Sequence, residues 1–370
     1  MRRVWCVADS VISPLGLTSK DNYSQVTAGV SSSKQERNPH FGNTPVCISH
    51  LSGLSTPSGA TRFEAMSRMA LQELKRKASI PQSRTLFILS TTKGNIEVLE
   101  NGQPGHPRIH LHDVARMLAA EMGVENHRVI SNACISGVAA ILLAKRYLEN
   151  GVVDHVLVLG ADTLNRFVIS GFQSLNALSA NPCKPFDSGR SGINLGEAAA
   201  ALLLSAKPEE FETASTIAIR GGSISNDANH ISGPSKTGEE LAMAVKIALE
   251  ASGIGADEID FISAHGTATL YNDEMEAKAF HLSKLGDKPI HSLKGNFGHT
   301  LGAAGVVETV MCVHSLLHQE LMPSYGFEKI GVSQPVNVIK KRTPKSMRFG
   351  LKTASGFGGC NAALVLSVEK

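Results

Sequence analysis

Cys134, His265 and His299 are the side chains of this sequence whose types and settings could do nucleophilic chemistry. Cys134 lies between an apolar run at 128–130 and a nearly all-apolar helical pattern at 137–147, which predicts a strand, a tight turn and a buried helix. The free N–H groups and the positive dipole end at a helix N-terminus favour thiolate over thiol. We therefore expect a lowered thiol pKa and a nucleophile at this cysteine. The alternative is a small buried hydrophobe.

Each of the two histidines follows a predicted strand. Apolar strand patterns at 260–264 and 290–293 end just before His265 and shortly before His299, and α/β sheets place their sites at the carboxyl ends of strands. A lysine, Lys294, precedes His299 by five residues. Either histidine alone could equally be a structural hydrogen-bonding group. Zinc bound by the cysteine and both histidines is a further alternative, because all three are zinc ligands.

The elements that must position these residues repeat along the chain. We expect a first half at 1–206, which carries the cysteine, and a second half at 207–370, which carries both histidines. Each half contains one strongly apolar helix that begins just after a reactive side chain, Cys134 in one half and His299 in the other. Two such helices facing each other between two sheets would bring these side chains together.

The composition is that of an ordinary soluble globular protein. The 370 residues are 42% hydrophobic and 19% charged, with a formal net charge of +3, which does not favour a nucleic-acid partner. Six cysteines without paired spacing indicate reduced thiols and a cytoplasmic protein. We expect neither a signal peptide nor a membrane span.

Two segments read mostly as loop. Residues 29–60 are rich in Ser, Gly, Pro and Asn, and 165–196 is a long loop-rich segment of the kind that usually wraps a site. His106, His110 and His112 lie close together in the sequence. A metal cluster there is conceivable, but no carboxylate or cysteine at matching spacing supports it, and surface histidines are the simpler interpretation.

Five stretches of the sequence carry a family resemblance. They are Asn132-Ala133-Cys134; Pro185-Phe186-Asp187-Ser188-Gly189-Arg190 with Gly196-Glu197; His265-Gly266-Thr267-Ala268-Thr269 with Asp273 and Glu276; Lys294 through Gly298-His299 with Gly302-Ala303-Ala304-Gly305; and Gly356-Phe357-Gly358-Gly359 with Asn361. In register, they resemble the β-ketoacyl-acyl carrier protein synthase family, the Cys-His-His condensing enzymes with a thiolase fold. The resemblance implies an α/β, thiolase-like fold in which two similar α/β halves, 1–206 and 207–370, form a layered α-β-α-β-α core.

The resemblance also implies an acyltransferase that performs a decarboxylative Claisen condensation, in fatty acid or specialised polyene or polyketide synthesis. Cys134 would take an acyl group from acyl carrier protein as a thioester. His265 and His299 would donate N–H groups to the enolate oxygen that forms when malonyl on the carrier loses carbon dioxide. Lys294 completes the implied catalytic set. Backbone N–H groups of Cys134 and Phe357 would form the oxyanion hole, and the Phe357 ring would be either a gate or a core aromatic.

Supporting residues follow from the same resemblance. Glu276 would pair with Lys294, and Asp273 and Gly358 would support the site. Positions that hold a structural cation in some relatives correspond here to Glu276, Glu308 and Asn361. Otherwise we expect no metal and no cofactor, because the substrates are carried on the phosphopantetheine arm of the carrier.

The implied partners are acyl carrier protein and a second subunit. That subunit would be either a copy of this chain or a related synthase subunit in a heterodimer. One alternative is a non-catalytic partner subunit, although such subunits lack the nucleophile that Cys134 supplies. Another is a degradative thiolase acting on coenzyme A thioesters, which the pairing of His265 with His299 disfavours.

Overall fold

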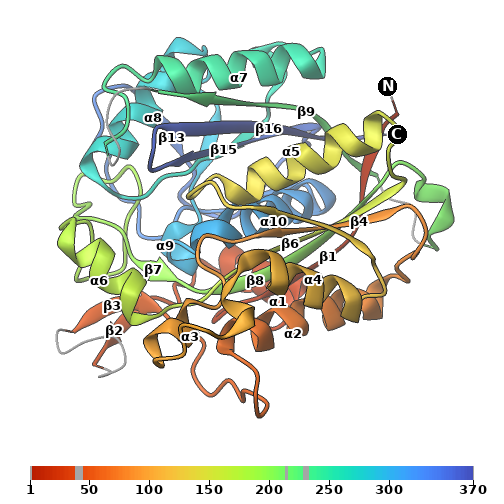
Figure 1. Ribbon diagram of the computed structural model, residues 1–370. Helices are drawn as coiled ribbons and strands as arrows, with labels where there is room; N and C mark the ends of the chain where they lie inside the picture. The colour runs from red at the N-terminus through yellow and green to blue at the C-terminus, as the bar shows by residue number, and fades with distance from the viewer. Residues whose placement is uncertain (1, 38–44, 213–215, 228–232, 370) are drawn as a thin grey trace.

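The long strands of the protein form one continuous sheet, which Figure 1 shows arranged in two layers. The computed structural model describes residues 2–37, 45–212, 216–227 and 233–369. Along the sheet the order is β13-β11-β10-β15-β16-β9-β1-β8-β6-β4-β5. The strands of the first half are β1 (Val4–Ile12), β4 (Thr85–Ser90), β5 (Asn126–Ile130), β6 (His155–Asp162) and β8 (Ala198–Ser205). Those of the second half are β9 (Ile217–Asn226), β10 (Phe261–Ser263), β11 (Pro289–His291), β13 (Asn337–Val338), β15 (Phe349–Gly356) and β16 (Cys360–Val368).

The two halves have the same strand order. In the first half, β1 is followed across the sheet by β8, β6, β4 and β5, and in the second half β9 is followed by β16, β15, β10 and β11. In both, the first two pairings are antiparallel and the next two are parallel. The predicted similarity of the two halves is therefore confirmed. β5, which leads to Cys134, is the topological counterpart of β11, which leads to His299.

Helices cover both layers and fill the space between them (Figure 1). α7 (Glu239–Ser252), with α8 (Leu270–Leu282) against it, lies outside the second-half strands, and α2 (Arg62–Lys77) and α4 (Leu111–Glu121) lie outside the first-half strands. α5 (Ser136–Glu149) and α10 (Ala304–His318) lie between the layers. All residues of β6 and β8 are buried, as is usual for strands covered on both faces. These layers confirm the predicted α-β-α-β-α core.

The two layers of strands are not separate sheets, which corrects the expectation of helices between two sheets. β1 and β9 pair antiparallel where Val4 faces Ile219 and Trp5 faces Ala218. These two residue pairs join the halves edge to edge. The boundary predicted at 206/207 lies between β8 and β9, and it stays a prediction.

α5 and α10 touch backbone to backbone at two glycines. A Cβ on Gly137 would lie 2.6 Å from the backbone N of Val306 and 2.7 Å from the Cα of Gly305. Real side chains do not pack at such distances, so the crossing requires glycine. The prediction that the two apolar helices face each other is confirmed.

The segment 29–60 is not only loop. It contains β2 (Lys34–Glu36) and β3 (Val46–Ser49), while 38–44 lies outside the described residues. β3 pairs in parallel with β7 (Leu195–Gly196). Strands this short carry little periodic signal, and the partner of β3 comes from far along the chain, so the composition of the segment did not indicate them.

The loop-rich segment 165–196 begins with a helix, α6 (Arg166–Ser174). Its N-cap is Asn165, whose side-chain oxygen accepts a hydrogen bond from the backbone N–H of Val168 at 2.9 Å, which is a common way to start a helix. The remaining helices are α1 (Ser19–Thr27), α3 (Ile96–Glu100), α9 (Lys294–Phe297) and the 3₁₀ turns η2 (Pro107–Ile109), η3 (Pro208–Glu210), η4 (Ala256–Glu258) and η5 (Leu301–Ala303).

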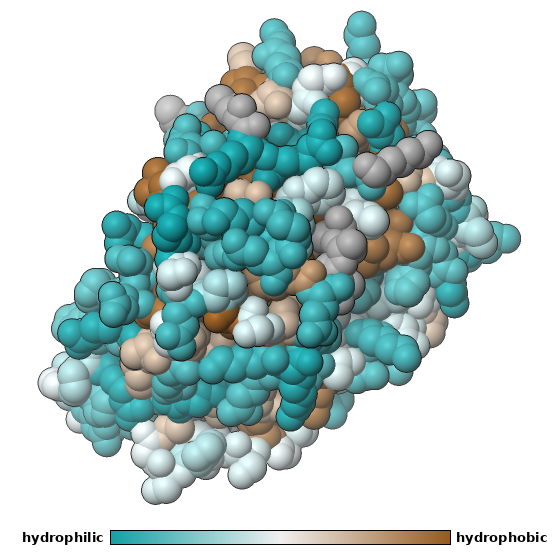
Figure 2. Space-filling view, turned by 90° about the vertical axis from the view of Figure 1, so that its right-hand side faces the viewer, coloured by the Kyte–Doolittle hydropathy of each residue, from teal (hydrophilic) through white to brown (hydrophobic). Residues whose placement is uncertain are grey.

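The stretch Leu301–His318 is long and apolar enough to cross a membrane by composition, and it is the one such helix among the described residues. However, 83% of it is buried inside the fold, because it contains α10 between the two layers. The face shown in Figure 2 is mainly hydrophilic, with apolar residues in small separate groups. We assign this stretch to the protein core.

Candidate active site

Cys134 lies in a tight turn between β5 and α5. Ala133 has a φ of 43°, and the Ser136 hydroxyl closes the turn. This hydroxyl accepts a hydrogen bond from the backbone N–H of Asn132 (2.8 Å) and donates one to the carbonyl of Ala133 (2.6 Å). The predicted strand, turn and buried helix are confirmed. Cys134 is buried and lies just before α5, the helix that runs between the two layers of strands (Figure 1).

His265 follows β10, where a buried carboxylate holds the backbone. Glu276, on α8, accepts hydrogen bonds from the backbone N–H groups of His265 (2.8 Å) and Gly266 (2.5 Å). α8 starts at Leu270, where the Thr269 side chain caps it by accepting a hydrogen bond from the backbone N–H of Asn272. Since the carboxylate binds the backbone, the imidazole is left free, and Nδ1 of His265 has no hydrogen-bond partner among the described residues.

His299 lies in the loop between α9 and α10. Its backbone N–H donates to the carbonyl of Asn194 at 2.7 Å. The preceding Gly298 has a φ of 68°, and a Cβ there would lie 2.7 Å from the carbonyl oxygen of Leu195, so this tight contact with β7 requires glycine. In the part of the chain that the structure describes, neither ring nitrogen of His299 has a hydrogen-bond partner.

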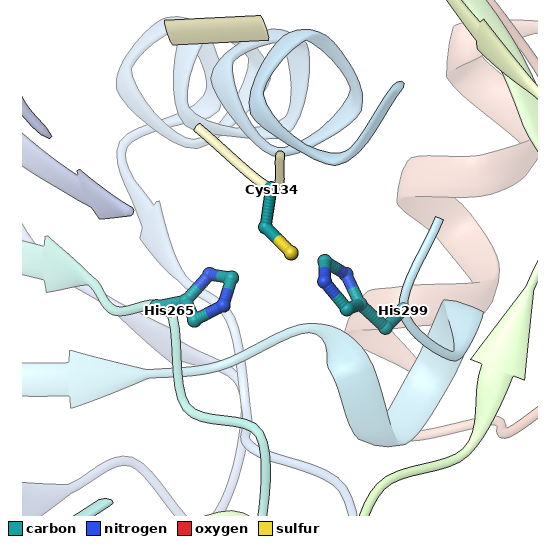
Figure 3. Close-up of side chains that lie close together, drawn as sticks. All are labelled: Cys134, His265 and His299. Atoms are coloured by element: carbon teal, nitrogen blue, oxygen red, sulfur yellow. The ribbon is translucent and has the colours of Figure 1, made fainter. Parts of the chain in front are cut away.

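The thiol and the two imidazoles point toward one another, as Figure 3 shows. One ligand atom from each of Cys134, His265 and His299 lies within 4.8 Å of the other two. The two rings meet edge to face, with centroids 5.2 Å apart. The structure thus brings together the three side chains that the sequence singled out. A soft metal such as zinc could also use these three ligands, so the alternative of a metal site stays open on geometry alone.

The expected low pKa of Cys134 is wrong. Burial raises the pKa of this thiol to about 11, although the Lys294 ammonium and the backbone N–H of Phe357 both act to lower it. A lone sulfur anion in a dry interior is costly, and the turn buries Cys134 more deeply than a helix end exposed to water would. The resting thiol is therefore protonated at neutral pH.

Both imidazoles are held neutral. Burial, followed by the charge of Lys294, lowers the pKa of His265 and of His299 well below the ordinary value. The Lys352 ammonium acts in the same direction on both rings. A neutral imidazole can donate one N–H to an oxygen, so each ring can serve as a hydrogen-bond donor without carrying a charge.

Lys294 pairs with Glu308, not with the predicted Glu276. Its Nζ lies 2.7 Å from Oε1 of Glu308, on α10, and Nζ of Lys352 lies 2.6 Å from the other carboxylate oxygen. All three side chains are almost completely buried. Although burial acts against ionisation, the two ammonium groups keep the pKa of Glu308 below its usual value.

Lys352 is the residue of this site that the sequence analysis did not identify. It lies in β15, whose other residues are mostly apolar, glycine or small. A lysine inside such a strand is the signal that could have found it, since a buried lysine needs a partner. The residues that match cation-holding positions have protein partners instead: Glu276 binds backbone N–H groups, Glu308 binds two ammonium groups, and the amide oxygen of Asn361 accepts from the Ser355 hydroxyl.

Asp273 lies in the first turn of α8, and Gly358 lies in the loop between β15 and β16. The carboxylate of Asp273 accepts hydrogen bonds from the backbone N–H groups of Phe186 (2.7 Å) and Ala268 (3.1 Å). It thereby ties the loop after α6 to the loop that follows His265, and burial raises its pKa to about 7. Gly358 has a φ of 84°, which glycine adopts readily.

The Gly-rich loop at 356–359 packs against the cysteine. A Cβ on Gly356 would lie 3.0 Å from the backbone N of Cys134, so the loop approaches this N–H closely. The ring of Phe357 is 39% exposed and stacks on Phe172 with centroids 5.7 Å apart. This exposure favours the interpretation of Phe357 as a gate over that of a core aromatic.

A cavity of about 540 Å³ opens above the thiol. Its floor is formed by Cys134, His265 and His299, and its walls include Phe357 and Arg190. The walls also come from α6, the two residues that follow it and the start of α8, through Phe172, Leu175, Asn176, Leu270, Tyr271 and Asn272. A long, thin thioester-bearing arm could reach the thiol through such an opening.

The histidines at 106–112 do not gather into a site. Nδ1 of His106 accepts a hydrogen bond from the backbone N–H of Arg108 (3.1 Å), and Nε2 of His112 lies 3.4 Å from Nε2 of His127. Within the described ranges, the one group of three or more possible metal ligands is the cysteine and histidine trio at the cavity floor. The interpretation of these residues as surface histidines therefore holds.

Comparisons with known proteins agree with the architecture. The family "Beta-ketoacyl synthase, N-terminal domain" matches residues 114–210, and "Beta-ketoacyl synthase, C-terminal domain" matches residues 217–328, together more than half of the chain. Among solved structures, a ketosynthase in complex with its chain length factor from Xenorhabdus doucetiae is 28% identical with a TM-score of 0.88, covering 99% of this chain and 98% of that chain.

Curated relatives point the same way. The chain is 30% identical over 263 residues to "3-oxoacyl-[acyl-carrier-protein] synthase 2" of Mycobacterium leprae, which covers 66% of this chain and 63% of that protein. It is 31% identical over 273 residues to "Putative polyketide beta-ketoacyl synthase 1" of Streptomyces cyaneus, covering 69% of this chain and 63% of that protein. The matched part of the chain thus spans 63% of the length of each relative.

The two topologically equivalent halves, with the cysteine and the histidines at matching strand ends, define a thiolase-like protein. The chain belongs to the beta-ketoacyl synthase family.

Proposed function

We propose that this protein is a β-ketoacyl-acyl carrier protein synthase, an acyltransferase that joins a Cys134-bound acyl group to malonyl on acyl carrier protein. The observation that carries this function is the convergence of one thiol and two neutral imidazoles at the floor of a single cavity. Family membership supports the same chemistry. Fatty acid synthesis and specialised polyene or polyketide synthesis are both compatible with the relatives.

The first step is acyl transfer. Sγ of Cys134 attacks the thioester carbonyl of the acyl carrier, the carbon–sulfur bond to phosphopantetheine breaks, and the departing thiol takes the proton that Cys134 loses. Backbone N–H groups of Cys134 and Phe357 would stabilise the oxyanion of the tetrahedral intermediate. The close approach of Gly356 to the backbone of Cys134 supports this pairing.

The second step is decarboxylative condensation. Malonyl on the carrier loses carbon dioxide, and the electron pair of the broken carbon–carbon bond forms an enolate. His265 and His299 donate N–H groups to the enolate oxygen, while the enolate carbon attacks the acyl carbonyl and the thioester bond to Cys134 breaks. The products are carbon dioxide, the β-ketoacyl carrier and the Cys134 thiolate, which takes a proton from water to return to the resting thiol. Lys294, with Glu308, positions His299 and favours the anion.

No separate cofactor is needed for these steps, because both substrates are carried on the phosphopantetheine arm of the carrier. We further propose a cytoplasmic dimer, either of two copies of this chain or with a related subunit. A ketosynthase–chain length factor complex among the structural relatives supports the second possibility. The presence of Cys134 disfavours the alternative that this chain is a non-catalytic partner subunit.

The test is acyl loading. Incubation with acyl carrier protein bearing acyl chains from acetyl to palmitoyl should add the mass of the acyl group to Cys134, measured on the intact protein. Cys6→Ser, which removes a thiol outside the cavity lining, should load like the wild type, and Cys134→Ser should not load. Absence of an adduct with every chain length would contradict the function. Loading from coenzyme A thioesters in preference to carrier thioesters would favour the thiolase alternative.

A further inference from the structure

Lys352 is a fully buried residue of β15, and oxygens surround its ammonium group. Nζ donates hydrogen bonds to the carbonyl oxygens of Ser263 (3.2 Å), Ala264 (3.4 Å) and Thr353 (2.5 Å). It also lies 2.6 Å from Oε2 of Glu308, as an ion pair. The side chain has no exposed surface. This lysine is therefore fully coordinated, which is what burying a charge requires.

Three carbonyl oxygens and one carboxylate are the kind of ligand set that hard cations take in proteins. The oxygens are farther from the centre than the about 2.0–2.1 Å that Mg²⁺ demands, so the cage suits an ammonium group or a large monovalent cation. We propose that Lys352 is a built-in cation, which fills a site that K⁺ or NH₄⁺ would otherwise take and positions both histidines from there. Its catalytic importance rests on the proposed function.

The contacts of Lys352 lead to both imidazoles. Ser263 and Ala264 directly precede His265, so their carbonyls set the path of the chain that carries this ring. Glu308 uses its other oxygen to hold Lys294, which begins the α9 segment before His299. Removing the amine takes a buried donor away from these carbonyls and a counter-charge away from Glu308, a costly change that the backbone relieves by moving. Lys352 is thus a positioning residue that acts on His265 through the end of β10 and on His299 through Glu308 and Lys294.

Two substitutions separate charge from volume. Lys352→Ala opens the cage, whereas Lys352→Met fills much of the same space without a charge. We expect both to lower kcat for condensation and for malonyl decarboxylation at least about tenfold, and about 100-fold if a ring moves by ~1 Å, with a smaller change in KM. K⁺ or NH₄⁺ should restore Lys352→Ala but not Lys352→Met. Tetramethylammonium at equal ionic strength, which is too large for the cage, should restore neither.

Two readouts do not depend on condensation: the melting temperature and the rate at which iodoacetamide alkylates Cys134. Both should respond to K⁺ in Lys352→Ala. Lys145→Met is the matched control, because it removes another largely buried amine, one that pairs with Glu149 on α5, and it should show no K⁺-specific response. If the melting temperature of Lys352→Ala rises specifically with K⁺ while the wild type never loads an acyl group, the cation site holds and the proposed function fails.

Two outcomes would contradict the proposal that Lys352 acts as a built-in cation. One is a wild type that condenses while Lys352→Ala behaves identically in all salts. Another is a Lys352→Met variant with wild-type kcat and melting temperature. The wild type itself provides a test that needs no variant to fold: because Lys352 already fills the cage, its melting temperature should be equal in KCl and in tetramethylammonium chloride. A K⁺-specific stabilisation of the wild type would contradict the assignment, and its absence supports it.

Discussion

Gly137→Ala tests whether the crossing of α5 and α10 sets the geometry of the site. The new Cβ would lie 2.6 Å from the backbone N of Val306, whereas ordinary contacts begin near 3.4 Å, so the helices must part by about 0.8 Å. Backbone faces backbone on both sides, and no flexible side chain can yield. α5 begins just after Cys134, and α10 follows His299 by a few residues. Parting the helices therefore moves the thiol away from the imidazole.

The effects on stability and on rate should differ in size. Overpacking costs about 1–3 kcal/mol, partly offset by the ~1 kcal/mol by which alanine favours a helix over glycine. The net cost is then about 0–2 kcal/mol, and with about 2.1 cal/mol/K of unfolding entropy per residue a chain of this length should lose at most about 3 °C of melting temperature. Acyl loading should fall far more, by about 10- to 100-fold, because a misplacement of ~1 Å between reacting groups can cost about 100-fold.

The assay is the rate of acyl loading by intact mass, with the melting temperature measured in parallel. Gly171→Ala is the matched control: it is also a helical glycine, in α6, and a Cβ there meets nothing within 4 Å, so it should be neutral or slightly stabilising. A Gly137→Ala variant that loads within twofold of the wild-type rate would refute the role of this crossing. A loss of loading that merely follows unfolding would refute it as well.

Three further outcomes follow from the site. Cys134→Gln should abolish acyl loading yet still release carbon dioxide from malonyl carrier, because both imidazoles remain; a folded variant without this release would show that the histidines do not hold the enolate. Glu308→Gln leaves the buried ammonium groups of Lys294 and Lys352 without their carboxylate, so the free energy of unfolding should fall by about 3–5 kcal/mol and the melting temperature by about 4–6 °C. An unchanged melting temperature would mean that Lys294, Lys352 and Glu308 are not all ionised. Alkylation of Cys134 by iodoacetamide needs the thiolate, so its rate should still be rising at pH 10, with a half-maximum near the pKa of about 11; a plateau by pH 9 in the folded protein would contradict the effect of burial.

Most of the fold could be predicted because long elements carry strong periodic signals. The apolar run of β8 and the all-apolar pattern of α10 were recognisable without any structure. β3 and α6 were missed for physical reasons. β3 is four residues long and is paired by β7 from far along the chain, and α6 lies in a segment rich in turn-forming residues, where a single Asn165 cap decides the start.

The features of the site that depend on the local sequence could be predicted. Those that depend on tertiary packing and burial could not. The meeting of Cys134 and His299 was predictable because each precedes one of two strongly apolar helices, and these helices face each other in the structure. The partner of Lys294 could not be predicted from the sequence. Glu276 and Glu308 lie on different helices, and the packing of α10 decides which of them contacts Lys294. The direction of the Cys134 pKa depends on burial, which no spacing of residues reveals.

The protonation states place a condition on the mechanism. The proposed reaction brings several anions into this cavity: the thiolate, the tetrahedral oxyanion, the malonyl carboxylate and the enolate. Lys294 and Lys352 share one carboxylate, Glu308, so these three ionised side chains together carry one net positive charge. That charge favours each anion in turn and opposes an imidazolium at His265 or His299. In the proposed reaction the histidines therefore act as neutral hydrogen-bond donors, and the proton of Cys134 leaves with the thiol of the departing carrier.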